Sequence, residues 1–350
     1  MYRIDNATAT STLPTPLAPG PVAKGYFQSG NPGIGQLATT VDRDWANATQ
    51  EEICAVIEAA GITLAKTNHT QLLAALQKLF VTRTKVTTNM TIYVSPTGND
   101  TTGNGLTPGT AFATVQEAIN VVYASYDWNN HLCTIQLADG TYPFGVASAY
   151  QAYFPGQPFG MPQFGLTLQG NPTTPQNVFL NATNANCIMA DRALMNISGL
   201  TVTGSGSVNT PTNTQGQGIS VIRGGTIISN NVIAMNCGGS GFRADNAGTI
   251  ILSGTGNTIA GTGGAGLFAA EGTQIYCLGS TLTVSGFNAS NAVFVSDQGR
   301  LSMDSTTFVG SATGVRYIAT NLGLITTGGG GPNYLPGSTA GVVANNGVYT

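Results

Sequence analysis

Three acidic residues recur at similar places in a repeated stretch of this sequence. Asp245, Glu271 and Asp297 each come shortly before a glycine of the repeat. Glycoside hydrolases use two carboxyl groups, about 5 Å apart in retaining enzymes and about 6.5–9.5 Å apart in inverting ones. If successive repeats stack as parallel strands, neighbouring acids lie about 5 Å apart and Asp245 lies about 10 Å from Asp297. The pattern therefore permits a catalytic set on stacked strands.

The alternative for these three acids is a structural role in turns. Asp and Asn are common in turns because their side chains bond the local backbone. The acids precede their glycines by three, one and two residues, and the same slot holds Arg223 and Asn321 in flanking repeats. A lyase would need a base beside a dense acidic cluster; Arg243 lies near Asp245, but the cluster is missing. The turn interpretation is favoured, and we expect three other acids to be solvent-exposed turn residues: Asp139, Asp191 and Asp304.

A second group of candidate residues is a run of aromatics between residues 142 and 164. Four prolines interrupt this run, which is too many for a central strand. We therefore predict a long loop that leaves the main body. Its rings could fill a subunit interface, stack on sugars, or pack on the body of their own chain. The residues proposed for glycan binding or a subunit interface are Tyr142, Phe144, Tyr150, Tyr153, Phe154 and Phe159.

The repeat predicts the elements that position all these residues. Six copies, with a period of about 22 to 27 residues, start at positions 218, 241, 266, 292, 314 and 341. Each copy has a later glycine and then an apolar residue: Gly225, Gly248, Gly272, Gly299, Gly323 and Gly347 are the glycines. Self-similarity at this period indicates a solenoid, because one unit cannot bury its own apolar face. Strand-like alternation, as in 131–137, favours a mainly β solenoid.

Domain boundaries follow from changes in composition along the chain. Residues 1–38 are rich in Pro, Gly, Thr and Ala and predict an extended arm; residues 39–85 predict two short helices. Asp42 or Asp44 is expected to cap the first helix, and Thr67 or Asn68 the second. Residues 86–350 predict the solenoid, with a capping helix near 114–125. Ten or eleven rungs at about 4.8 Å give a rod about 50 Å tall.

Composition excludes several classes of function. The net charge is −3 with only 12 Lys plus Arg, which argues against nucleic-acid binding. Five dispersed cysteines without a CxxC pair indicate buried thiols, and with only two histidines we expect no metal site and no cofactor. No long apolar run predicts a signal peptide or membrane insertion.

Two stretches resemble known families. The run from Tyr93-Val-Ser-Pro-Thr-Gly-Asn-Asp to Ala111-Phe-Ala-Thr-Val-Gln-Glu-Ala-Ile resembles the opening of pectate-lyase-like right-handed parallel β-helices, especially those of bacteriophage tailspikes. The phrases Gly25-Tyr-Phe, Thr39-Thr-Val-Asp-Arg-Asp-Trp and Thr67-Asn-His-Thr-Gln-Leu-Leu resemble the anchor of phage and prophage tail fibres. Together the two resemblances cover roughly residues 25–125.

The resemblance implies a homotrimeric tail fibre or short tailspike. Its N-terminus would attach to baseplate or tail proteins, with Tyr26, Phe27 and Trp45 as the attachment residues. The right-handed parallel β-helix would contact host surface polysaccharide, and the protein would belong to the virion tail after assembly in the host cytoplasm. One alternative is a polysaccharide depolymerase that uses Asp245, Glu271 or Asp297 on capsule or lipopolysaccharide. Another is a purely structural tail component that carries a second protein.

Overall fold

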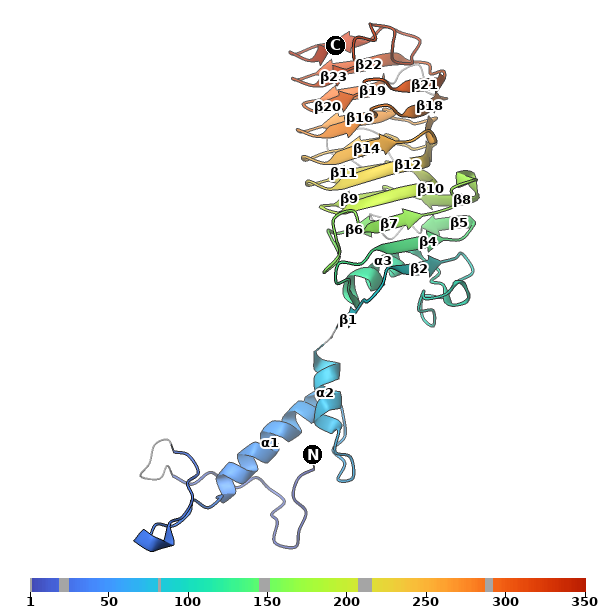
Figure 1. Ribbon diagram of the computed structural model, residues 1–350. Helices are drawn as coiled ribbons and strands as arrows, with labels where there is room; N and C mark the ends of the chain where they lie inside the picture. The colour runs from blue at the N-terminus through green and yellow to red at the C-terminus, as the bar shows by residue number, and fades with distance from the viewer. Residues whose placement is uncertain (1, 19–24, 81–82, 145–151, 207–215, 287–291) are drawn as a thin grey trace. The chain divides into compact units, whose positions relative to one another are not determined.

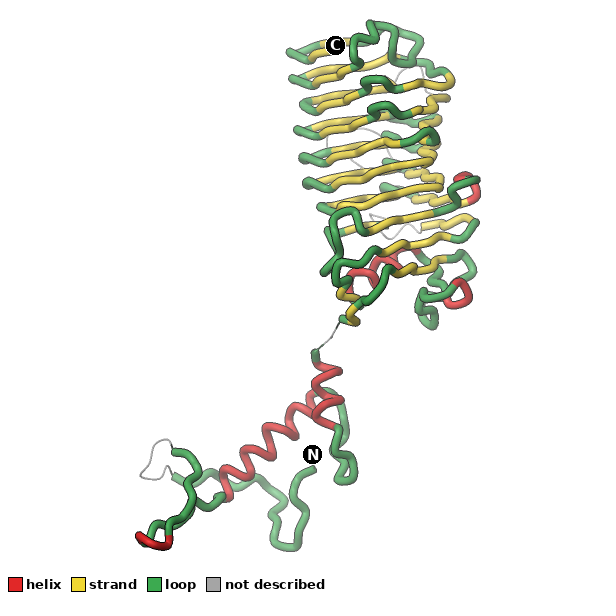
Figure 2. Tube along the Cα trace, in the orientation of Figure 1, coloured by secondary structure: helices red, strands yellow, loops and turns green. Residues whose placement is uncertain are grey.

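The chain forms two compact units in a computed structural model, residues 1–82 and 83–350. The structure describes residues 2–18, 25–80, 83–144, 152–206, 216–286 and 292–350. The arm and the helices, predicted as separate segments 1–38 and 39–85, belong to one unit. Figure 1 labels the elements of both units, and Figure 2 separates helix from strand.

The first unit consists of two α-helices and an arm that lies on them. Helix α1 (Arg43–Ala59) begins as predicted, because Asp42 accepts a hydrogen bond from the Trp45 amide at 2.7 Å. Helix α2 (Gln71–Leu79) begins later than expected: its N-cap is Thr70, whose own amide is bound by Asn68. A 3₁₀ turn, η1 (Pro32–Ile34), lies in the arm.

Ion pairs attach the arm to α1. Arg3 donates to Glu51 and Glu58, which are seven positions apart and so lie on one face of the helix. The core beneath is small and centres on Ile57, Ala60 and Ala75. The predicted attachment residues are exposed: Tyr26 is 98% exposed, and Phe27 meets Trp45 edge to face at 5.4 Å. Their role in attachment stays a prediction.

The second unit is a parallel β-helix. Its longest face stacks ten strands in a single parallel order, which agrees with the predicted ten or eleven rungs. These strands are β2 (Met90–Val94), β4 (Cys133–Leu137), β7 (Leu166–Gln169), β10 (Leu194–Gly204), β12 (Thr226–Met235), β14 (Thr249–Ser253), β17 (Gln274–Tyr276), β20 (Arg300–Ser302), β23 (Leu324–Thr326) and β25 (Val348–Tyr349).

A second parallel sheet of eight strands faces the first across the core. In stacking order from the N-terminal side it contains β6 (Tyr153–Phe154), β9 (Ile188–Asp191), β11 (Ile219–Ile222), β13 (Phe242–Ala244), β16 (Leu267–Ala270), β19 (Ala292–Asp297), β22 (Val315–Thr320) and β24 (Val342–Val343). Each of its strands from β9 to β22 leads through a short turn into a strand of the first sheet (Figure 1).

A corner divides the longer rungs into two faces. Strand β10 pairs with β7 before Gly199 and with β8 after it, so one strand serves both faces. Gly199 and, in the next rung, Asn231 take φ of 66° and 55°, the left-handed conformation that Gly and Asn tolerate best. The remaining strands of the face beyond the corner are β5 (Gly140–Phe144), β8 (Val178–Ala182), β15 (Asn257–Ala260), β18 (Thr281–Ser285) and β21 (Thr307–Gly310).

The recurrent glycine has a steric cause. A Cβ on Gly323 would lie 2.2 Å from the carbonyl oxygen of Ser296 in the preceding rung. A Cβ on Gly347 would lie 2.2 Å from the carbonyl oxygen of Ala319, and one on Gly248 would lie 2.7 Å from that of Val221. Only glycine lets these turns approach the rung below closely enough for strands to pair. The repeated glycine in the sequence therefore results from the close stacking of successive rungs.

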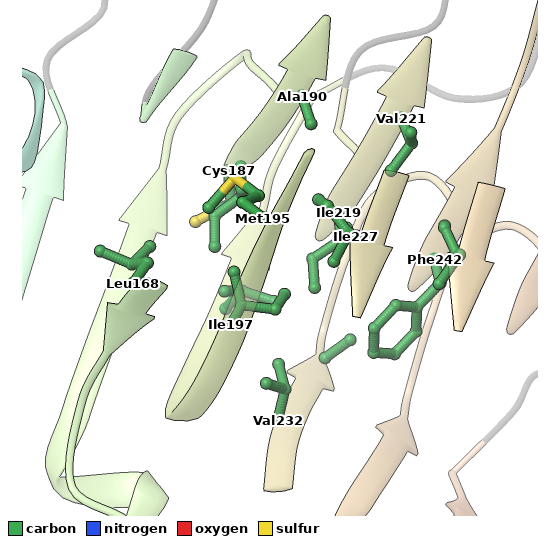
Figure 3. Close-up of a cluster of buried hydrophobic side chains, with 14 of the residues drawn as sticks. Leu168, Cys187, Ala190, Met195, Ile197, Ile219, Val221, Ile227, Val232 and Phe242 are labelled. Carbon is green, nitrogen blue, oxygen red and sulfur yellow. The ribbon is translucent and has the colours of Figure 1, made fainter. Parts of the chain in front are cut away.

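The core is a continuous apolar column inside the β-helix. Figure 3 shows Leu168, Met195, Ile197 and Ile227 of the first sheet in one buried cluster with Ile219 and Phe242 of the second. All five cysteines are free and buried, which confirms the predicted buried thiols; burial raises the pKa of the Cys187 thiol.

A helix covers the first rung. Helix α3 (Val115–Ala124) lies within the predicted range 114–125, and the Thr114 side chain accepts from the Glu117 amide at its start. Val115, Ile119 and Val122 are buried against the core, so the helix protects apolar surface that would otherwise meet water. The paired short strands β1 (Thr84–Lys85) and β3 (Tyr126–Asp127) lie beside it; the 3₁₀ turn η2 (Pro108–Thr110) contacts β2, and η3 (Pro175–Asn177) contacts β8, β10 and β12.

Candidate functional site

The predicted acids lie along the turn edge, defined here as the turns that follow β9, β11, β13, β16, β19 and β22. Strand pairing puts Ala244 beside Ala269 and Ala270 beside Asp297. Asp245 therefore shares a column with Ala270 and Asp297, two rungs apart, or about 10 Å. Glu271 belongs to the next column. The three acids are thus close together, but they do not form one straight ladder.

The column that contains Glu271 is set by backbone conformation. Its members all take a positive φ between 46° and 57°: Arg192, Arg223, Asn246, Glu271, Gln298, Asn321 and Asn345. This left-handed conformation is what the turn requires, and Asn adopts it more readily than most residues. The predicted equivalence of Arg223, Glu271 and Asn321 is confirmed by their shared position. The Glu271 side chain is exposed and makes no hydrogen bond within the described chain.

Asp245 is bound by an arginine of its own strand. Arg243 donates from Nε and Nη2 to the two carboxylate oxygens of Asp245, at 2.7 and 2.9 Å. The side chains are 14% and 8% exposed, and the guanidinium lies 4.3 Å above the Phe268 ring of the next rung. Charge, hydrogen bonds and ring stacking together hold the Asp245 carboxylate in one orientation.

Asp297 begins a ladder of amides. Asn321 donates to its Oδ1 at 2.9 Å, and Asn345 donates in turn to Asn321 at 3.0 Å. Each bond connects one rung to the next along the turn edge. The ladder satisfies polar groups at the turns and resists slippage of one rung past another.

Asp191 departs most from the sequence-based expectation. It was expected to be a solvent-exposed turn residue, but its side chain is 0% exposed. It accepts hydrogen bonds from Arg223 Nε at 2.7 Å, Tyr153 Oη at 2.7 Å and Arg192 Nε at 3.2 Å. The Arg223 hydrogen bonds outweigh burial and lower the pKa of Asp191 to about 2. The expectation failed because stacking brings arginines from two successive turns to one carboxylate.

The same contact corrects the interpretation of the aromatic run. Tyr153, in β6, donates a hydrogen bond to Asp191 of β9, and Phe154 beside Tyr153 is fully buried. Tyr142 is 2% exposed and donates to the carbonyls of Val94 and Ala138. Tyr142 and Phe154 therefore cannot line an exposed glycan site or a subunit interface, and the prediction is wrong for both. They belong to strands of the body, not to a projecting loop.

The other members of the run have different positions. Phe159 is exposed, and Arg83 lies 4.9 Å over its ring. Phe144 ends β5, and Tyr150 lies outside the described residues. The lone acids also differ: Asp139 is exposed and accepts from Asn171 and Asn177, while Asp304 is half-buried and accepts from Thr326 at 3.3 Å.

The turn edge thus has a mainly structural chemistry. Asp191 and Asp245 accept charge-assisted hydrogen bonds from arginines, and Asp297 accepts from an amide. A general acid or nucleophile needs a carboxyl group that is free to reach its substrate. Of the three predicted acids, only Glu271 has a carboxylate that accepts no hydrogen bond within the described chain. Within the described ranges, His, Cys, Asp and Glu nowhere gather in a group of three that could hold a metal, and no helix could span a membrane.

Comparisons with known proteins add limited information. No protein-family model matches the chain. A stretch of 83 residues is 41% identical to "Uncharacterized protein StfP" of Escherichia coli (strain K12), covering 24% of this chain and 37% of that protein. The chain thus matches little more than a third of that relative's length. A solved structure described as "Rhamnogalacturonan lyase" aligns with 73% of this chain and 62% of its own, at 15% identity and a TM-score of 0.34. The parallel β-helix therefore rests on the strand register itself.

Proposed function

We propose that this protein is a phage or prophage tail fibre or short tailspike component whose β-helix binds polysaccharide on a host cell. The observation that carries the proposal is the division of the chain into a small arm-and-helix unit and a long parallel β-helix, in that order. The anchor-like phrases lie in the first unit, and the tailspike-like opening lies at the start of the second.

Adhesion is favoured over cleavage because of the state of the carboxylates. Both oxygens of Asp245 are engaged by Arg243, and Asp297 is engaged by Asn321. A paired glycosidase mechanism needs two carboxyl groups that reach the same bond. Only Glu271 is exposed and unbound in this set, which supports binding without hydrolysis.

The proposal includes self-association and a location in the virion tail, after assembly in the host cytoplasm. Helix α2 carries exposed apolar side chains three positions apart, Leu73 and Leu76, and its C-cap residue Phe80 is exposed as well. This spacing is the seam by which helices of separate subunits associate. We propose a homotrimer, with Tyr26, Phe27 and Trp45 free to meet baseplate or tail proteins.

The test uses full-length protein, labelled and incubated with candidate host cells and with their purified capsule and lipopolysaccharide. Binding and newly formed reducing ends are measured in the same samples. We expect saturable binding that purified polysaccharide competes away, with no rise in reducing ends. Failure to bind any cell or polysaccharide would contradict the proposal and favour the structural carrier. Release of oligosaccharides would favour the depolymerase instead and direct mutagenesis to Glu271.

A further inference from the structure

A groove follows the corner of the β-helix, away from the turn edge. It consists of two adjoining hollows of about 580 and 390 Å³ that share Pro172. The first is lined by Tyr93, Gln136, Asp139 and Asn171 and bordered by the loop after β2. The second is lined by Ser198, Asn230, Asn231 and Thr255 at the corner itself. We call the two hollows together the corner groove. Figure 2 shows the strands that carry the groove, in yellow, stacked along the β-helix.

Strand register makes this groove linear. Tyr93 pairs with Gln136, Gln136 with Gln169, Gln169 with Ser198, and Ser198 with Asn230. The column crosses six consecutive strands from β2 to β14. At about 4.8 Å per rung, the groove is about 24 Å long. It has the length of an extended oligomer and is too long for a single small molecule.

Four polar side chains of the groove are available to a ligand, whereas those of Gln136, Asn171 and Asn231 bond the protein itself. The side chains of Tyr93, Ser198, Asn230 and Thr255 make no hydrogen bonds within the described chain. All four are partly or fully exposed. Phenol, hydroxyl and amide groups bond sugar hydroxyls in both directions, and a tyrosine ring offers an apolar face for a sugar ring.

Charge narrows the class of ligand. Among the described residues that line the groove, Asp139 is the only charged one, and none is Lys or Arg. A polymer with carboxylates or phosphates would find no cation there and would meet one fixed negative charge. The arginines Arg192, Arg223 and Arg243 lie on the turn edge instead, beside their own acids.

We infer that the corner groove binds an uncharged, linear polysaccharide lengthwise, with Tyr93 at one end and Asn230 and Thr255 at the other. The ligand runs along the column of rungs, and successive sugars meet successive exposed side chains. This inference rests on the proposed function and adds the place, the direction and the charge class of the glycan.

The experiment measures binding of full-length protein to size-fractionated fragments of a neutral host polysaccharide and of a uronic-acid polysaccharide, from both capsule and lipopolysaccharide. Two variants probe the groove, Tyr93→Ala and Asn230→Arg. Their matched controls are Tyr276→Ala, a half-buried tyrosine on β17, and Asn246→Arg on the turn edge, where Arg223 already occupies the same turn position in the preceding rung. Thermal unfolding of each variant confirms that the fold is intact.

We expect neutral fragments to bind, with affinity that rises with length until the groove is filled. Tyr93→Ala should weaken binding about tenfold or more, and Asn230→Arg should weaken it similarly by filling the groove. The two controls should bind like the unmodified protein. Preference for acidic fragments, or loss of binding in Asn246→Arg with Asn230→Arg unaffected, would overturn the inference and leave the proposed function standing. No binding to any polysaccharide would overturn both.

Discussion

The two edges of the β-helix use polar residues in opposite ways. Along the turn edge, Asp191, Asp245 and Asp297 are engaged by neighbours from the same or adjacent rungs. Along the corner groove, Tyr93 and Asn230 have no partner within the described chain and face solvent. The turn edge carries several charged residues of both signs, whereas the described lining of the corner groove carries one, Asp139.

The comparison distinguishes charged side chains that neighbouring residues already bind from neutral polar side chains that remain free to bind a ligand. Turns that stack every 4.8 Å or so bring like positions close together, and a charge that is buried there needs a partner. The groove carries neutral groups, which can stay unpaired in water at little cost. Free polar groups, rather than charged ones, therefore mark the proposed ligand surface. The following predictions test each side of the comparison.

The largest effect is expected at the Arg243–Asp245 pair. Replacement Arg243→Met leaves a largely buried carboxylate without its partner and should lower the free energy of unfolding by about 3 to 5 kcal/mol. Chemical denaturation of the purified variant measures the change. The double variant Arg243→Met, Asp245→Asn should recover much of the loss. A turn edge that binds glycan would instead lose affinity in the single variant while keeping its stability.

A smaller loss of stability should follow from Gly323→Ala. The new Cβ would lie 2.2 Å from the Ser296 carbonyl, so the rung must shift, at about 2 to 3 kcal/mol. Thermal unfolding measures this loss. Gly109→Ala is the matched control, because its nearest neighbour would be 4.0 Å from the Cβ and its backbone is not left-handed. Equal melting temperatures for the two variants would show that the close approach is not needed.

Acid should weaken the turn edge through Asp191. Its pKa is about 2 in the folded protein, and a free aspartate has a pKa of about 3.9. The folded form therefore gains stability from this group above about pH 4 and loses it as the pH falls toward 2, by about 2 kcal/mol in all. Melting temperatures between pH 5 and pH 2 should fall less steeply for Asp191→Asn than for the unmodified chain. Parallel pH profiles would contradict the Asp191–Arg223 assignment.

The smallest effect is expected in the groove itself. Ser198→Ala removes one hydroxyl that has no partner in the chain, so stability should not change. Affinity for a neutral oligosaccharide should fall by about 1 kcal/mol, or roughly fivefold, for one lost hydrogen bond. Ser285→Ala, at an exposed serine on β18, is the control and should bind normally. A lower melting temperature without a change in affinity would place Ser198 in the framework instead.

The sequence predicted the framework well because its causes are local. The glycine repeat reflects the close approach of each turn to the rung below, as at Gly323. Of the two caps proposed for α1, Asp42 is the N-cap, and this start was predictable because capping depends on a few adjacent residues. Neither Thr67 nor Asn68, the two residues predicted as the N-cap of α2, takes that position. Thr70, another polar residue two positions after Asn68, is the N-cap instead.

The candidate site was harder to predict because its contacts cross rungs. Asp191 and Arg223 are 32 positions apart, and only the register brings them together. Tyr142 and Phe154 were assigned to a projecting loop because nearby prolines were taken as breaks in the body. In the sequence, Arg223 occupies the same position of the repeat as Glu271. This equivalence could have predicted that charged residues of successive turns stack along one edge. The corner groove gave no signal, because its column of Tyr, Gln, Ser and Asn spans 138 residues from Tyr93 to Asn230 if both ends are counted.

The most direct measurement is an experimental density map of the full-length protein with a bound fragment of neutral host polysaccharide. We predict continuous density along the corner groove, from the Tyr93 ring to Asn230 and Thr255, with the Arg243–Asp245 and Arg223–Asp191 pairs unchanged. Density on the turn edge, in contact with Arg192, Arg223 or Glu271, would contradict the account. In that case the charged turns would be the functional surface and the groove a feature of the framework.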